Sequence, residues 1–206
     1  MVVAGMGAAT NARLKGATTI VAAAIRSAYT RSSAVAKPHR VVFDFKESKV
    51  WIEEGAGNLL VTNADVSNAG GADPATEAER KAIEQTDKIL RGPRPPKTSF
   101  KPVKGISVVE EDGVKIGRSL GARIRFREIL VSHQVDAVRD GRAYLYTWPG
   151  GATELAYIQL AKGEQPSSDD TMTLFVHPLT GKVKIVAGAK TIRVDEQSSE
   201  REDRIF

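Results

Sequence analysis

The 206-residue sequence has no cysteine and only three histidines. Without cysteine the chain has no disulfide framework, no thiolate nucleophile and no cysteine-based zinc site. His39, His133 and His177 show neither the HxH nor the HExxH spacing of metal-binding histidines. The glycine-rich segment at 5–10 resembles a dinucleotide-binding turn, but its sixth position is threonine and no parallel βαβ pattern follows. We therefore expect neither an enzyme activity nor a metal or cofactor.

Acidic residues are missing from the first 43 positions, which hold six basic side chains. The other 163 residues carry 24 basic and 25 acidic side chains, so the formal charge of +5 arises in the N-terminal segment. A nucleic-acid-binding domain usually spreads its basic face over the folded body, which argues against nucleic acid as a partner. A short basic collar beside an apolar start is instead typical of a segment near anionic lipid headgroups.

No hydrophobic run is long enough to cross a membrane. The first nine residues are apolar, but Asn11, Arg13 and Lys15 interrupt them, and a spanning helix needs roughly 20 apolar residues. A signal peptide would place its charges before the apolar run. The chain as given is therefore expected to be soluble, and its start resembles the last two turns of a membrane helix that begins upstream.

The clearest helical pattern covers residues 8–36. Apolar side chains recur there at mostly three- and four-residue steps, and Pro38 ends the pattern. The stripe is rich in alanine, which predicts a close approach to its partner surface. We expect a small body to leave this stripe uncovered, so that it packs on neighbouring helices in an assembly through Leu14, Val21, Ala24, Ile25 and Ala28.

The pattern changes to short strands after residue 40. A hairpin is expected over 41–45 and 50–52, and further strands at 106–110, 114–116, 122–131, 142–148, 153–160, 171–176, 182–187 and 190–194. Asp73-Pro74 predicts the start of a helix that runs to about Leu90. Sequential strands with tight turns predict antiparallel pairing.

These patterns predict an α+β fold, with a long N-terminal helix (1–38) packed on an antiparallel β body (39–206). The body contains one inserted helix within a helical and proline-rich insertion at about 73–104. We expect the β core to be built from Val42, Phe43, Trp51, Tyr144, Tyr146 and Phe175.

Four arginines, Arg118, Arg123, Arg125 and Arg127, are the candidates for contact with DNA or another anion. The last three alternate with apolar residues, which places them on one face of a strand. An exposed sheet face with arginines that protect its edge explains the same pattern, and we favour that explanation.

Three segments resemble a known family. Residues 12–54 (ARLKGATTIVAAAIRSAYTRSSAVAKPHRVVFDFKESKVWIEE), 141–160 (GRAYLYTWPGGATELAYIQL) and 173–185 (TLFVHPLTGKVKI) resemble the H-type minor pseudopilins of type II secretion systems, the GspH/FimT family. The resemblance covers about 40% of the chain. The processed N-terminus of that family, a glycine followed by FTLxE and an apolar span, is absent from the sequence, and nothing carries over to the insertion.

The resemblance implies a non-enzymatic structural subunit of a secretion pseudopilus, near its tip. Its partners would be other minor pseudopilins and the major pseudopilin. A missing N-terminal segment would anchor it by a single pass in the bacterial inner membrane, with the globular domain in the periplasm. The alternative is a type IV minor pilin of FimT/FimU type that binds DNA for uptake. The C-terminal tail argues against that alternative, because it carries five acids beside Arg201 and Arg204.

Overall fold

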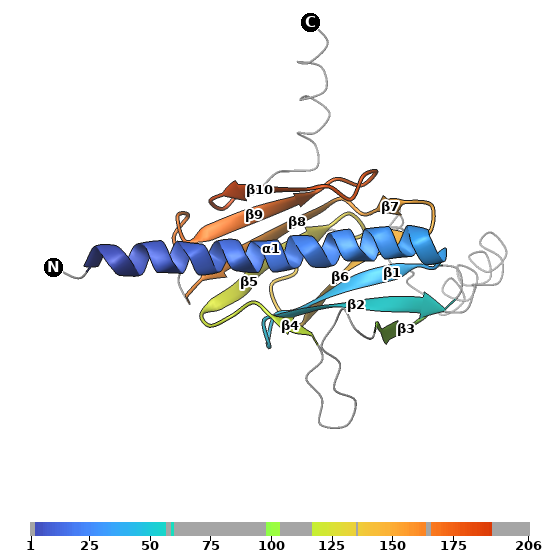
Figure 1. Ribbon diagram of the computed structural model, residues 1–206, viewed down its shortest axis with the longest axis horizontal. Helices are drawn as coiled ribbons and strands as arrows, with labels where there is room; N and C mark the ends of the chain where they lie inside the picture. Colours follow the sequence, from blue (N-terminus) through green and yellow to red (C-terminus); the bar gives the residue numbers. More distant parts are fainter. Residues whose placement is uncertain are drawn as a thin grey trace, which may run out of the picture.

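The computed structural model describes residues 3–56, 59, 98–103, 117–134, 136–163 and 166–190, with side chains from residue 12 onward. The expected helix from 73 to about 90, the expected strands at 106–110 and 114–116, and the segment after Lys190 lie outside these residues. Within the described part, the chain is α+β, with one N-terminal helix packed on antiparallel sheets (Figure 1).

Most elements follow the expected order along the chain. Helix α1 covers Val3–Val35, close to the expected range of 8–36. The strands are β1 (His39–Asp44), β2 (Lys49–Ala56), β3 (Ser99–Pro102), β4 (Arg118–Ser119), β5 (Ile124–Val131), β6 (Arg142–Trp148), β7 (Ala152–Thr153), β8 (Ala156–Lys162), β9 (Thr171–Val176) and β10 (Val183–Ala187). Strands β3 and β4 were not expected, and β3 pairs with β2 although its residues were assigned to the insertion at about 73–104.

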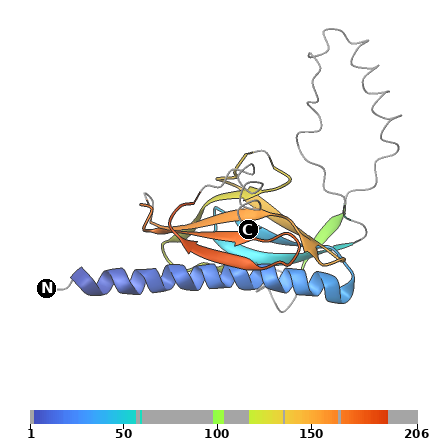
Figure 2. The same cartoon turned by 90° about the horizontal axis from the view of Figure 1, so that it is seen from above.

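The strands form two antiparallel sheets. The first has the order β3-β2-β1-β6-β7, with β4 also paired to β2, and the second has the order β10-β9-β8-β5. Helix α1 runs along one side of both sheets (Figures 1 and 2) and contacts strands of each. One helix therefore closes a core that belongs to both sheets.

The expected strand at 153–160 is instead two strands. Strand β7 pairs with β6 in the first sheet, and β8 pairs with β5 and β9 in the second. The carboxylate of Glu154, buried between them, accepts hydrogen bonds from the backbone N–H of Tyr146 and from the His133 ring. Because this side chain is tied to β6 and to the end of β5, the chain changes sheet here.

Alternation along the strands decides which side chains face α1. In the first sheet Val41 lies opposite Ile52 and Leu145, and all three side chains belong to the core that α1 closes. In the second sheet Ile158 lies opposite Ile129 and Leu174, which complete this core.

The expected β core is only partly right. Phe43 lies in the main core, where its ring meets Phe126 edge-on, whereas Val42 and Trp51 are buried on the opposite face of the first sheet. The prediction was wrong for Tyr144, Tyr146 and Phe175, which are only half-buried. These three rings alternate with core residues along their strands and therefore point away from α1.

Tyr29 fixes the C-terminal part of α1 to two turns of the β body. Its hydroxyl donates to the carbonyl oxygens of Gly151 (2.7 Å) and Leu179 (3.1 Å), which follow β6 and β9. Gly181 lies directly under the ring, with φ of +59°. A Cβ atom at this position would lie 2.6 Å from the Cγ and Cδ2 atoms of Tyr29, so the turn requires glycine both for its backbone and for its space.

Replacing Gly181 with alanine should therefore destabilise the fold strongly. The left-handed backbone and the displaced Tyr29 ring together should lower the free energy of unfolding by about 3 kcal/mol. Gly163→Ala is the matched control, because its φ is +77° and, apart from its chain neighbours, no atom of the described residues lies within 4 Å of the added Cβ; it should cost only about 1 kcal/mol. Urea unfolding of both variants measures the difference, and equal losses would contradict the close contact with Tyr29.

Candidate functional site

A groove runs between α1 and the last strand of the second sheet. Its volume is about 680 Å³. The floor is formed by Val183 and Ile185, on the side of β10 that faces the core, and Ile185 is 39% exposed. The α1 wall includes Ala22, Ala23 and Ser27, three small side chains. This is an apolar strip of the sheet that α1 leaves uncovered.

The helix residues expected to pack in an assembly lie elsewhere. The side chains of Leu14, Val21, Ile25 and Ala28 are at most 2% exposed and lie in the chain's own core, and Ala24 is half-buried against that core. The expectation that a small body leaves this stripe uncovered was wrong, because the two sheets side by side are wide enough to cover it. Any contact of α1 with a partner must use its other faces.

The N-terminal end of α1 projects beyond the sheets (Figure 2). Leu14 is the first buried side chain of the described part of the helix. Within the described residues, no helix is long and apolar enough to cross a membrane. Among the described side chains, the buried contacts of α1 with the sheets therefore begin at Leu14.

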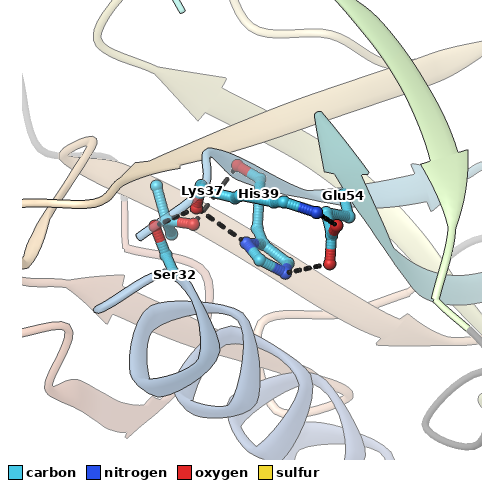
Figure 3. A network of polar contacts seen from close by, with 5 residues as sticks. Ser32, Lys37, His39 and Glu54 are labelled. Carbon is cyan, nitrogen blue, oxygen red and sulfur yellow. Dashed lines mark hydrogen bonds and ion pairs between the residues drawn. The ribbon is translucent and has the colours of Figure 1, made fainter. Parts of the chain in front are cut away.

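A polar network holds the joint between α1 and β1 (Figure 3). The Ser32 hydroxyl and the Nδ1 atom of His39 both reach the Lys37 carbonyl oxygen, at 2.9 and 3.0 Å. The Lys37 ammonium donates to Glu54 Oε1 at 2.5 Å, and the His39 Nε2 atom lies 3.6 Å from Glu54 Oε2. Because a carbonyl oxygen only accepts, His39 carries its proton on Nδ1 when neutral.

Burial controls the protonation of this joint. The side chain of His39 is fully buried, and loss of hydration lowers its pKa below the usual 6.5, although the bond to Lys37 and the charge of Glu54 oppose this. The hydrogen bond from Lys37 lowers the pKa of Glu54. A neutral histidine beside a Lys37–Glu54 ion pair is therefore the resting state of the joint near neutral pH.

The outer face of the first sheet carries a charged and aromatic cluster that the sequence analysis missed. Arg40 pairs with Glu53 through two contacts of 2.6 Å, and its guanidinium lies 4.1 Å from the Phe100 ring centroid and 4.4 Å from that of Tyr144. Trp51 Nε1 donates to the other Glu53 oxygen at 2.8 Å. The signal in the sequence was the alternation of Arg40 and Glu53 with apolar core positions on two strands of one hairpin.

A second ion pair closes the same face near the β1–β2 turn. Arg142 Nε donates to Asp44 Oδ2 at 3.0 Å, and the Glu47 backbone N–H donates to the other carboxylate oxygen. Burial raises the pKa of Asp44, but these hydrogen bonds and the positive charge of Arg142 outweigh it, so the pKa lies below its usual value. Both ion pairs link neighbouring strands. We therefore assign them to the stability of the sheet and not to a ligand site.

The four predicted DNA-contact arginines do not form one face. Arg118 lies in β4 of the first sheet, and Arg123 precedes β5 in a turn with φ of +66°. Arg127 sits in a bulge of β5, and only Arg125 and Arg127 come together, with Arg139, around a hollow of about 280 Å³. The expected alternation holds from 124 to 127, because Ile124 and Phe126 are buried while Arg125 and Arg127 lie outside. The bulge after Phe126 shifts the register only from Glu128 onward.

Residues 117–121 contain a G-x-S-x-G spacing that marks a nucleophilic serine in α/β-hydrolases. Here Ser119 is exposed on the two-residue strand β4, and its hydroxyl accepts a hydrogen bond from the Gly121 backbone N–H at 3.2 Å. The strand-to-helix turn that activates such a serine is not formed at this position. Among the described residues, no three His, Cys, Asp or Glu side chains are grouped to hold a metal ion.

Protonation of His39 should destabilise the fold as the pH falls. The unfolded chain takes up a proton near pH 6.5, whereas the buried ring resists it, so the free energy of unfolding should decrease from pH 7.5 to 5.5. His39→Gln should lose this part of the pH dependence. The exposed His177→Gln variant is the control and should keep it. Urea unfolding at both pH values measures the effect, and parallel slopes for wild type and His39→Gln would contradict it.

No family model matches the chain, and no curated protein or solved structure shows significant similarity to it. The comparisons therefore assign no family.

Proposed function

We propose that the chain is a structural subunit of a pilin-like filament, of the minor pseudopilin type that serves protein secretion. The observation that carries the proposal is the position of α1. From Leu14 to Ser32 the helix is packed on both sheets, while its N-terminal end extends beyond them (Figures 1 and 2). A projecting helix at one end of a β body offers one element for anchoring and leaves the body accessible.

The charge distribution supports the same role. The first 43 residues carry only basic charges, and two of them, Arg13 and Lys15, lie toward the projecting end of the helix, which suits an anionic membrane surface. In this proposal a segment upstream of Met1 supplies the span through the inner membrane, and the β body lies in the periplasm. The partners are other minor pseudopilins and the major pseudopilin, and the chain performs no chemical reaction.

Site-directed cross-linking tests the filament role. The sequence has no cysteine, so a single introduced thiol is unique in the chain. Ala23→Cys in the groove, expressed from the natural gene in its own host and alkylated with a thiol-reactive photo-cross-linker, should on illumination cross-link to proteins that carry an N-terminal pilin helix. Lys46→Cys, exposed in the β1–β2 turn, is the matched control and should give few such products. Equal products from both positions, or products without any pilin-like protein, would contradict the proposal.

The genomic sequence upstream of Met1 gives an independent check. An in-frame glycine followed by FTLxE and an apolar stretch that continues into the start of the chain would support membrane anchoring. An in-frame stop codon without such a segment would argue against it.

A type IV minor pilin that binds DNA is the second candidate. It is favoured by Arg125, Arg127 and Arg139, which line one hollow, although Arg139 is partly neutralised by Glu128. If this surface holds DNA, Arg127→Ala should weaken duplex binding and reduce the salt dependence by about one phosphate contact. Arg118→Ala, in the other sheet, should have little effect. Fluorescence anisotropy with labelled duplex DNA at low salt measures both, and an absence of binding by the wild-type chain removes this candidate.

A further inference from the structure

The groove beside β10 has a shape that can accommodate a second helix. Its floor is the core-facing side of β10, where Val183 is half-buried and Ile185 is 39% exposed. A helix lying next to α1 on the same face of the second sheet would cover both residues, because helices packed side by side lie about 8–10 Å apart. An added strand would instead pair with the backbone of β10 and leave this floor exposed.

The α1 wall of the groove permits a close approach. Ala22, Ala23 and Ser27 line it with small side chains, so that a neighbouring helix can come near the α1 backbone. Small residues at such spacing on a solvent-facing side of a helix are by themselves no site. Here they adjoin an uncovered apolar strip of the sheet, and the two surfaces form one continuous groove.

Among the described residues, the charged side chains that line the groove are both basic. Arg26 and Arg31 line it, and neither forms an ion pair or hydrogen bond with a carboxylate of the described residues. The Nε atom of Arg31 is buried without a hydrogen-bond partner among them. The positive charge of Arg31 acts on the carboxylate of Glu54, but this carboxylate already forms an ion pair with Lys37. Lys182 and Lys184 are exposed but do not line the groove, since Lys184 lies opposite Phe175 on the face of β10 that points away from α1.

This charge disfavours a second copy of α1 as the occupant. Helix α1 has no acidic residue along its whole length. Packing two copies side by side would bring their arginines and lysines together without counter-charges, and like-charge contacts across an interface are costly. An occupant with carboxylates would instead satisfy the unpaired guanidinium groups through charge-assisted hydrogen bonds.

We propose that the groove between α1 and β10 binds an acidic helix of a different protein, which presents small side chains to Ala23 and Ser27 and carboxylates to Arg26 and Arg31. The inference rests on the proposed filament role and specifies the partner's chemistry. Arg26 and Arg31 are separated by about 7.5 Å along α1, since a helix rises 1.5 Å per residue. Two carboxylates four residues apart on the partner helix, about 6 Å along its axis, can reach both.

A pair of designed peptides tests this preference on the chain as it exists. Both are alanine-based helices of about 18 residues, one with two glutamates four positions apart and one with lysines in their place. Binding to the chain is followed by the fluorescence anisotropy of a dye on each peptide. The glutamate peptide should bind at least about tenfold more tightly than the lysine peptide.

Two double variants with the same change in net charge separate the groove from general attraction. R26E/R31E should weaken binding of the glutamate peptide by about tenfold or more and should favour the lysine peptide. R13E/K15E reverses two exposed charges on α1 outside the groove and should change binding less than about twofold. Equal losses in both double variants, or no binding of the glutamate peptide to the wild-type chain, would overturn the proposal.

A third variant keeps the test valid if R26E/R31E does not fold. Ser27→Leu places a larger side chain in the groove without changing the charge and should weaken the glutamate peptide; unchanged binding would overturn the proposal. Sedimentation of the chain alone tests whether a second copy occupies the groove. If the wild-type chain self-associates and Ser27→Leu abolishes this, the groove binds a second copy and the proposal is overturned. The peptide assay needs no filament, and the genomic sequence upstream of Met1 tests membrane anchoring without the groove, so the two proposals can fail separately.

Discussion

Burial of one helical stripe under two sheets is the constraint on which the rest of this structure depends. The sheets share no continuous hydrogen-bonded ladder in the described residues, and α1 contacts strands of both. Val21 and Ile25 are completely buried at the centre of this contact. The helix therefore does more than cover a finished body, because it joins the inner faces of two sheets into one core. Its alanines keep it close enough to both sheets for this to work.

The same constraint explains what the sequence predicted well. Helical periodicity up to Pro38 and alternation along the later strands are local signals, and the helix, the first hairpin and most described strands follow them. It was harder to predict which of the alternating side chains of a strand face the core. Tyr144 and Tyr146 are good core residues by type, but Leu145 takes the inner position between them, and only the pairing with β1 decides which face is inside. The bulge between Phe126 and Glu128 likewise depends on the partner strand β8, which a sequence pattern does not contain.

The groove beside β10 was missed for a related reason. The most apolar stripe of the helix was expected to serve assembly, because the body was expected to be too small to cover it. The structure uses that stripe internally and leaves a weaker surface of alanines, serine and arginines outside. No single residue in this surface is unusual for an exposed helix, and its meaning comes from β10, more than 150 positions away in the chain. Without knowledge that β10 lies beside this part of α1, the residue types alone did not indicate a groove.

The joint at Lys37 and His39 also determines how the molecule responds to mechanical load. Helix α1 is covalently connected to the β body at its C-terminal end alone, where the Ser32, Lys37, His39 and Glu54 network reinforces the turn. A pull on the projecting N-terminal end acts along the helix axis and parallel to its contacts with both sheets. All buried contacts from Leu14 onward then share the force in shear, instead of opening one after another as in peeling. In a filament under tension, this arrangement would let a small body resist extraction of its helix without a disulfide.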